Sequence, residues 1–234
     1  MKAIAALFTV LALISGPVNL AYSQNLDVTQ NKMHMLESSV WIQNGDGVCG
    51  GTYFTSQKLI TAAHCVNGVA PDGRVIVHTY QGSSLMGVVE RRNVELDLAI
   101  VVTTNRPDGQ PYIQLGDSVN VFDEVWGIGA PLGEPFIVSH GYISKIVIDS
   151  FENCDKNDKG GTGQQQILTI DIMAFGGDSG GGVFDANGRL VGVWVRQIQV
   201  GWTCENQNGV AVPLWGFAVG IDTVKGFLGQ EANQ

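Results

Sequence analysis

Ser179 is the residue with the clearest chemical potential, because it lies in the glycine-rich segment Gly-Gly-Asp-Ser-Gly-Gly-Gly at 176–182. Glycines on both sides allow a serine to stand in a tight turn with its hydroxyl exposed. They also leave backbone N–H groups able to point at an oxyanion beside that hydroxyl. Alone the segment is ambiguous, since other glycine-rich turns look similar. It also fits the Gly-x-Ser-x-Gly pattern of α/β hydrolases, but that fold carries its histidine after the serine. All 4 histidines of this chain precede Ser179, which excludes that fold.

A serine hydroxyl becomes a useful nucleophile when a base accepts its proton and a carboxylate fixes the tautomer of that base. The order His, Asp, Ser is met by His64, Asp97 and Ser179. Asp97 stands within an apolar run, where a carboxylate is costly to bury without a partner. An imidazolium is a suitable partner. Taken singly, His64 fits a satisfied core histidine and Asp97 fits a turn or cap residue, so the hypothesis depends on all three together.

The composition excludes several classes of protein. Hydrophobic residues make up 44% and charged residues 15% of the 234 residues, so the chain can bury a sizeable core and is not of the disordered type. It has 13 basic against 22 acidic residues and no long basic run, which argues against a nucleic-acid partner. Its 31 glycines suit an all-β chain with many turns.

Short runs with strand character alternate with turn residues along most of the chain. The predicted strands are 40–43, 58–61, 75–80, 98–102, 124–128, 142–148, 166–172, 190–195 and 210–212. This spacing predicts β-sandwiches or barrels. Only 221–228 has the apolar spacing of a helix. The polar, turn-rich stretch 103–111 is the best candidate for a boundary between two halves of the chain.

The N-terminus has the layout of a secretory signal peptide. An apolar run covers 3–15, and the small residues Ala21 and Ser23 stand at the −3 and −1 positions of a cleavage site. We therefore expect a signal peptide over 1–23 and a mature chain that begins at Gln24 and is secreted or periplasmic, with no membrane attachment after signal removal. The alternative is an uncleaved membrane anchor, for which the apolar core is short.

The four cysteines favour disulfides over a metal site. They include no Cys-x-x-Cys pair, and the chain has no His-Glu-x-x-His motif, so neither zinc nor another metal is expected. In an oxidising compartment an even count suggests two bridges, although sequence alone leaves the connectivity open. We choose the nearest-neighbour pairs Cys49–Cys65 and Cys154–Cys204. Four buried thiols are the alternative.

Three segments in this order resemble the trypsin/chymotrypsin-like serine proteases. They are Thr-Ala-Ala-His-Cys at 61–65, Asp-Leu-Ala-Ile-Val at 97–101 and Gly-Asp-Ser-Gly-Gly at 177–181. The resemblance extends to Cys-Gly-Gly-Thr at 49–52. Further segments look like the bacterial Deg/HtrA-type branch, namely 127–133, 190–193 and 216–219. Only 55 residues follow Ser179, too few to complete a second barrel and add the PDZ domain that such proteases often carry.

The resemblance implies an all-β fold of two six-stranded antiparallel β-barrels, followed here by a short C-terminal helix. The protease domain would cover 24–234, with the first barrel at about 36–105 and the second at about 110–228. The active site would lie in the cleft between the barrels. The family needs no cofactor and acts on polypeptide substrates.

The family's catalytic roles carry over onto matching positions. Ser179 would attack the scissile carbonyl, His64 would act as base and then acid, and Asp97 would orient and stabilise the imidazolium. The backbone N–H groups of Gly177 and Ser179 would form the oxyanion hole. The Cys49–Cys65 bridge would clasp the histidine loop. The alternative function is a catalytically silent binding protein with a protease fold.

Two positions depart from the trypsin pattern. The first is Asp178, which pairs with a freed N-terminal amine in activated trypsin-like enzymes, whereas no activation site is visible here. We expect an internal basic partner for Asp178; the amine of Gln24 and solvent are the alternatives.

The second departure concerns the specificity pocket. Met173 occupies the position at which trypsin-like enzymes carry an acidic pocket floor, so cleavage after Lys or Arg is not expected. We assign Met173, Ala174, Val195 and Gln197 to the pocket and expect cleavage after small or apolar side chains. Arg196 could approach the pocket rim together with Gln197.

Overall fold

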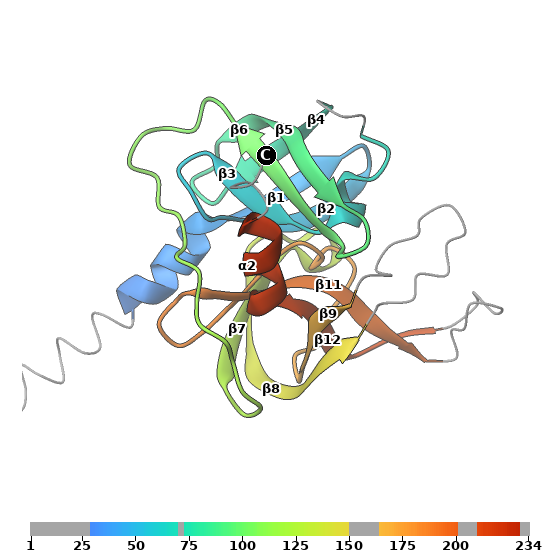
Figure 1. Ribbon diagram of the computed structural model, residues 1–234. Coiled ribbons are helices and arrows are strands. Elements are labelled where there is room, and N and C mark those ends of the chain that lie inside the picture. The colour runs from blue at the N-terminus through green and yellow to red at the C-terminus, as the bar shows by residue number, and fades with distance from the viewer. Residues whose placement is uncertain (1–28, 70–72, 150–163, 201–209, 230–234) are drawn as a thin grey trace, which may run out of the picture.

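The protein forms two closed β-barrels in a computed structural model that describes residues 29–69, 73–149, 164–200 and 210–229. The strands of the first barrel are β1 (Ser39–Asn44), β2 (Gly47–Tyr53), β3 (Lys58–Thr61), β4 (Arg74–Thr79), β5 (Ser84–Asn93) and β6 (Leu98–Thr103). They are hydrogen-bonded in the antiparallel order β1-β2-β3-β6-β5-β4. In Figure 1 this barrel is the upper body.

The second barrel has the same strand number and is also antiparallel. Its strands are β7 (Glu124–Gly129), β8 (Ile137–Asp149), β9 (Gln165–Ile170), β10 (Gly182–Phe184), β11 (Leu190–Val200) and β12 (Val210–Gly220). The order is β10-β11-β12-β9-β8-β7. Single-turn 3₁₀ helices follow β3 and β7, at η1 (Ala63–Val66) and η2 (Pro131–Gly133). The prediction of two six-stranded antiparallel barrels is therefore confirmed.

The apolar run at the start of β6 is continuous because this strand faces two cores. Leu98 and Ile100 belong to the core shared by the two barrels and the C-terminal helix. Ala99 and Val101, which point the other way, fill the interior of the first barrel. All four are fully buried. The strand is thus fixed on both faces, which gives the residue just before it, Asp97, a rigid support.

The C-terminal helix α2 (Ile221–Gly229) confirms the one helix predicted from periodicity. Its apolar side buries Ile221, Val224 and Phe227 in the shared core. Figure 1 shows α2 in front of the junction of the two barrels, which agrees with this packing.

Residues 29–38 are helical, although no helix was predicted there. Most side chains of this helix are exposed, and Met35 is its main contribution to the shared core. An amphipathic helix normally carries a wider apolar stripe, so periodicity could not reveal this one.

Three strands escaped prediction, namely β2, β5 and β10. The glycines of β2 and β10 obscure their strand character, yet they permit close packing between the barrels. A Cβ on Gly50 would lie 2.6 Å from the Cα of Gly181. Glycine is therefore required where β2 meets the serine loop.

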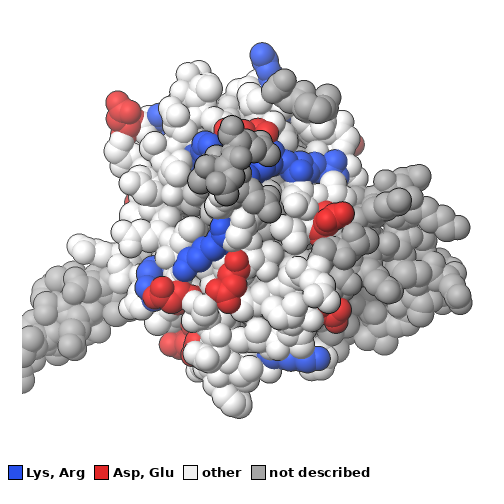
Figure 2. Space-filling model, in the orientation of Figure 1, with Lys and Arg blue, Asp and Glu red and all other residues white. Residues whose placement is uncertain are grey.

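The face of the molecule in Figure 2 carries few charged side chains. Figure 2 shows one face, on which Lys and Arg lie beside Asp and Glu and uncharged surface covers most of the area. No extended basic surface is visible on this face. Among the described residues, neither helix combines the length and the apolar character needed to cross a bilayer.

Candidate active site

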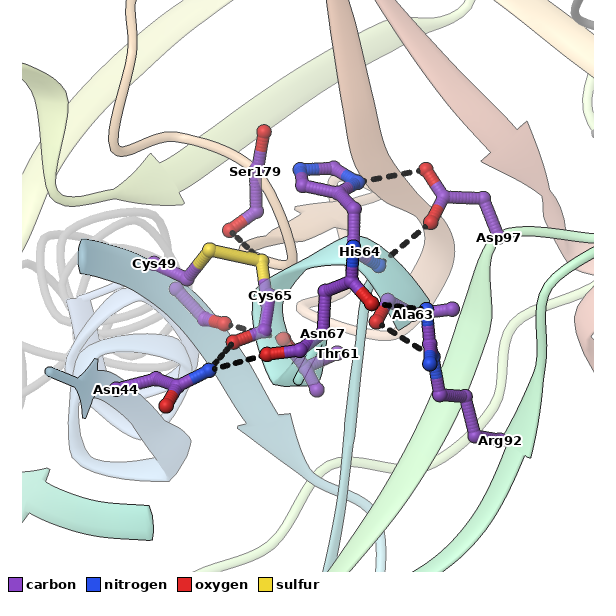
Figure 3. The surroundings of a disulfide bond; sticks show 11 residues. Asn44, Cys49, Thr61, Ala63, His64, Cys65, Asn67, Arg92, Asp97 and Ser179 are labelled. Atoms are coloured by element: carbon purple, nitrogen blue, oxygen red, sulfur yellow. Dashed lines mark hydrogen bonds and ion pairs between the residues drawn. A yellow bond between two sulfur atoms is a disulfide. The ribbon is translucent and has the colours of Figure 1, made fainter. Parts of the chain in front are cut away.

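His64 is held at the end of a buried strand. It lies in η1 directly after β3, and its neighbour Cys65 forms the predicted disulfide with Cys49 of β2. Figure 3 shows this bridge beside the histidine. On the other side, Arg92 donates from Nε to the carbonyl oxygen of Ala63 at 3.1 Å. The imidazole therefore projects from a turn that is fixed at both sides.

Asp97 accepts hydrogen bonds from both the side chain and the backbone of His64. One carboxylate oxygen lies 2.8 Å from Nδ1 of His64, and the other accepts the backbone N–H of His64 at 2.9 Å. Asp97 comes immediately before β6 and adopts a positive φ of 52°. Because an N–H at Nδ1 donates to the carboxylate, Nε2 is the nitrogen that can accept a proton. In Figure 3 the imidazole lies between Asp97 and Ser179.

Ser179 comes from the second barrel but is bonded to the first. Its loop connects β9 to β10, and its carbonyl oxygen accepts the backbone N–H of Gly50 in β2 at 2.7 Å. The disulfide sulfur of Cys65 lies 3.5 Å from the same oxygen. The next residue, Gly180, donates its N–H to the carbonyl of Trp194 in β11 at 2.6 Å. The structure thus brings together His64, Asp97 and Ser179, which are far apart in the sequence.

The backbone N–H groups of Gly177 and Ser179 form no hydrogen bond within the described part of the chain. Gly177 has a φ of +105°, and a Cβ on it would overlap the carbonyl oxygen of Ala130. Only glycine fits there without strain. Two unused donors next to the serine hydroxyl are the arrangement that stabilises a developing oxyanion.

Asp178 lies behind this loop in an unusual electrostatic environment. One carboxyl oxygen accepts the N–H of Phe175 at 2.8 Å. Burial raises the pKa of Asp178 to about 6, and the hydrogen bond from Phe175 only partly opposes this. No Lys, Arg or His forms an ion pair with it among the residues that the structure describes, so the expected internal basic partner is not found there. The alternative partner, the amine of Gln24, lies outside the described residues.

A pocket of about 190 Å³ opens beside Ser179. Its lining includes three of the four predicted residues, Ala174, Val195 and Gln197. The fourth, Met173, is 62% exposed and does not line the pocket, so its assignment is corrected. The physical reason is alternation along extended backbone, since its neighbours Ile172 and Ala174 are buried.

Sequence analysis missed several residues of the site. Phe175 and Trp194 are the aromatic residues that line the pocket; Phe175 was considered only as part of the run 173–175, and nothing in the motifs marks Trp194. Gly50, which anchors the Ser179 carbonyl, was visible only as part of the Cys-Gly-Gly-Thr segment. Gly50 must be glycine because it packs against Gly181 in the folded protein. Such a contact between distant residues cannot be recognised from the pattern of a single sequence.

One group of potential metal ligands occurs within the described ranges, formed by Cys49, His64 and Cys65 with ligand atoms within 4.8 Å of one another. Both sulfurs belong to the disulfide, so the group offers a single imidazole. The second predicted bridge, Cys154–Cys204, lies outside the described residues.

The sequence also matches known proteins. The family model for the trypsin-like peptidase domain matches residues 48–193. A serine protease HtrA-like protein of Staphylococcus epidermidis is 30% identical over 77% of this chain. The magnetosome formation protease MamE of Magnetospirillum gryphiswaldense is 33% identical over 58%. This chain spans only 29% and 17% of the lengths of these two relatives.

Solved structures show the same fold. The active form of the Rv3671c protease from M. tuberculosis matches with a TM-score of 0.69 at 21% identity, over 85% of this chain and 82% of that one. The HtrA-type protease AlgW with a tripeptide matches with a TM-score of 0.70 at 19% identity, over 87% of this chain and 62% of that one. With the family model covering most of both barrels, the chain belongs to the trypsin-like peptidase domain family.

Proposed function

We propose that this protein is a serine endopeptidase that hydrolyses polypeptides through an acyl-enzyme. Ser179 is the nucleophile, and His64 accepts its proton at Nε2 and later gives it to the leaving amine. Asp97 holds the imidazole and stabilises its cationic form. The observation that carries this proposal is the pair of hydrogen bonds that Asp97 accepts from Nδ1 and the backbone N–H of His64, at 2.8 and 2.9 Å, beside a serine from the other barrel.

The N–H groups of Gly177 and Ser179 serve as the oxyanion hole. They face no other acceptor within the described chain, so they can hydrogen-bond the oxygen that becomes negative when Ser179 attacks. Such donors act without reorganisation because the loop already holds them in place. The reaction calls on side chains and backbone alone.

The enzyme cuts after small or apolar side chains. The apolar side chains in the pocket wall are Ala174, Phe175, Trp194 and Val195. Arg196 also lines the pocket and repels Lys or Arg at this position.

Export to a secreted or periplasmic location is supported by the Cys49–Cys65 disulfide, since such bridges persist in oxidising compartments.

A fluorophosphonate probe tests the proposal without knowledge of the substrate, because it reacts with an activated serine. We expect labelling of the purified protein and none of the Ser179→Ala variant. His64→Ala should also abolish labelling while leaving Ser179 in place. A folded wild-type protein that resists the probe would contradict the proposal and favour the silent binding protein.

A further inference from the structure

The turn that follows β7 is hydrogen-bonded to the segment that carries the oxyanion hole. The N–H of Leu132 in η2 donates to the carbonyl oxygen of Gly176 at 2.7 Å, and the N–H of Ala130 donates to that of Gly177 at 3.3 Å. The turn lies within the described chain and contributes no residue to the lining of the pocket. It therefore borders the reacting centre at a place that the acyl residue of a substrate does not fill.

Leu132 is exposed although its backbone conformation is unfavourable for leucine. Its side chain is 77% exposed and its φ is 56°. A positive φ is an outlier for a bulky residue, because its Cβ then approaches the following carbonyl oxygen. Burial does not offset this cost, since the side chain remains in water. Such strained residues cluster at ligand-binding sites, so a leucine here favours a contact with a ligand.

Other apolar side chains extend the surface that begins at Leu132. Phe136 also has a positive φ, of 62°, and its ring packs edge-on against Tyr80 of the first barrel with the ring centroids 5.3 Å apart. Tyr80 and Ile137 are themselves exposed. These residues come from both barrels. Leu132 thus belongs to an apolar surface that starts at the oxyanion segment and reaches the first barrel.

The direction of a bound substrate follows from the pocket and the oxyanion hole. The acyl residue, whose carbonyl carbon Ser179 attacks, places its side chain in the pocket and its carbonyl oxygen at the N–H groups of Gly177 and Ser179. The polypeptide therefore runs from the pocket past Gly177. Ala130 and Leu132 are bonded to that segment through its carbonyl groups. The residues after the scissile bond are the ones that reach this turn.

Alternation of side chains selects one of these residues. The pocket belongs to the second barrel, so the first residue after the scissile bond points toward the first barrel and the second points again toward the second barrel. The second residue lies about 7 Å along the chain from the acyl residue. Its side chain meets η2, which is part of the second barrel and is bonded to the pocket residue Gly176. We infer that Leu132 is a specificity-determining residue that selects an apolar side chain at the second position after the scissile bond of polypeptide substrates.

This inference rests on the proposed protease activity and is tested by acyl transfer. A thiobenzyl ester of a peptide that ends in Ala forms the acyl-enzyme, for which the amides of Ala-Leu and Ala-Asn then compete. The amine nitrogen bonds to the acyl carbon while the bond to the Ser179 oxygen breaks, and His64 passes the amine proton to that oxygen. The attacking dipeptide occupies the place of the leaving chain, so the product ratio reports that side alone. We expect about tenfold more product with Ala-Leu, equivalent to about 1.4 kcal/mol, from partial burial of one leucine side chain.

Two substitutions of Leu132 separate a contact with substrate from a structural role. Leu132→Asn and Leu132→Gly remove the apolar side chain, accept a positive φ and keep the N–H that Gly176 binds. Each should bring the product ratio close to one, while hydrolysis of the acyl-enzyme by water keeps its rate. Phe122→Asn is the matched control. Phe122 is 84% exposed with a φ of 76°, but it lies at the opposite end of β7, so its substitution should leave the ratio unchanged.

The outcomes are distinguishable. A probe-reactive wild type that uses the two dipeptides equally, or neither of them, overturns the inference and leaves the protease proposal intact. The same conclusion follows if both Leu132 variants keep the preference, or if Phe122→Asn loses it to the same extent. A wild-type protein that neither reacts with the probe nor hydrolyses the ester overturns both proposals.

Discussion

The two barrels contribute to the site by different physical means. The first barrel supplies side chains, His64 and Asp97, held by hydrogen bonds and flanked by the Cys49–Cys65 bridge. The second barrel supplies a loop whose chemistry depends on its backbone, through the N–H groups of Gly177 and Ser179. The first arrangement depends on the functional groups of these two side chains. The second tolerates few side chains, because its glycines are packed against carbonyl groups.

The acidic residues show the same contrast. Asp97 of the first barrel has two N–H partners on His64 and lies near the cation Arg196. Asp178 of the second barrel has a single backbone donor from Phe175, and burial raises its pKa. Asp97 therefore has two hydrogen-bond donors for its carboxylate oxygens, whereas Asp178 has one donor and burial disfavours its charged form.

The largest effect should come from Asp97→Asn, which breaks the side-chain arrangement of the first barrel. Asparagine accepts a positive φ, so the backbone at this position is kept. Its amide, however, cannot hold the Nδ1–H tautomer of His64 as a carboxylate does. We expect kcat to fall by about 10⁴ with little change in thermal stability. Peptide hydrolysis and thermal unfolding measured on one preparation check this, and a loss below tenfold would contradict it.

The next effect should come from Gly177→Ala, which breaks the backbone arrangement of the second barrel. The new methyl group overlaps the carbonyl of Ala130 at a φ that alanine disfavours. The N–H of residue 177 must then move, which should lower kcat by about 10² to 10³ and also destabilise the fold.

The neighbouring Gly176 provides a matched control. A Cβ there meets nothing within 4 Å. Gly176→Ala should therefore keep the unfolding midpoint and kcat, although the residue lines the pocket and can change KM. Equal kcat values for the two alanine variants would show that Gly177 has no special role.

This difference between the barrels also explains what could be predicted. His64 and Asp97 were found because side-chain chemistry needs particular residue types in a particular order. Gly177 was found through the same motif, with the glycine pattern indicating unused N–H groups. The fold class followed from strand spacing together with the family resemblance.

The features that were not predicted from the sequence depend on tertiary contacts. Met173 was assigned to the pocket by its position relative to Ser179, but strand alternation turns it outward. Trp194 enters the pocket wall beside the bulge in β11, which has no marker in the sequence. The helix over 29–38 buries too few residues for its period to be visible.

Removal of the disulfide tests how far the first barrel depends on covalent support. Cys49→Ala combined with Cys65→Ala opens a link across 16 residues, for which we expect a loss of about 3 kcal/mol in the free energy of unfolding. The hydrogen bonds that His64 donates to Asp97 remain, so kcat should fall much less than in Asp97→Asn. Urea unfolding checks the first expectation. Substitution is preferable to a reducing agent because it leaves Cys154 and Cys204 unchanged. A kcat loss as large as that of Asp97→Asn would show that the bridge positions the histidine.

The smallest and most selective effect concerns Asp178. A folded-state pKa of about 6, against 3.8 for a free carboxyl group, means that the folded protein holds this proton while the unfolded chain releases it. Between these two values the stability of the fold therefore decreases as the pH rises, and the full deficit is present above pH 6. An asparagine side chain resembles the protonated acid and can still accept the N–H of Phe175. Asp178→Asn should thus be more stable than the wild type by about 1 to 2 kcal/mol at pH 7, and equal to it near pH 4.

Urea unfolding at pH 4, 5, 6 and 7 measures this difference directly. A variant that is less stable at pH 7 would show that the ionised carboxylate has a cationic partner, such as the amine of Gln24. The second barrel would then rely on a charge pair like the first. If the Asp178→Asn variant is the more stable and its advantage in free energy of unfolding grows with pH, the ionised acid destabilises the oxyanion loop. It would also explain why the loop keeps its shape through glycines and backbone hydrogen bonds rather than through that side chain.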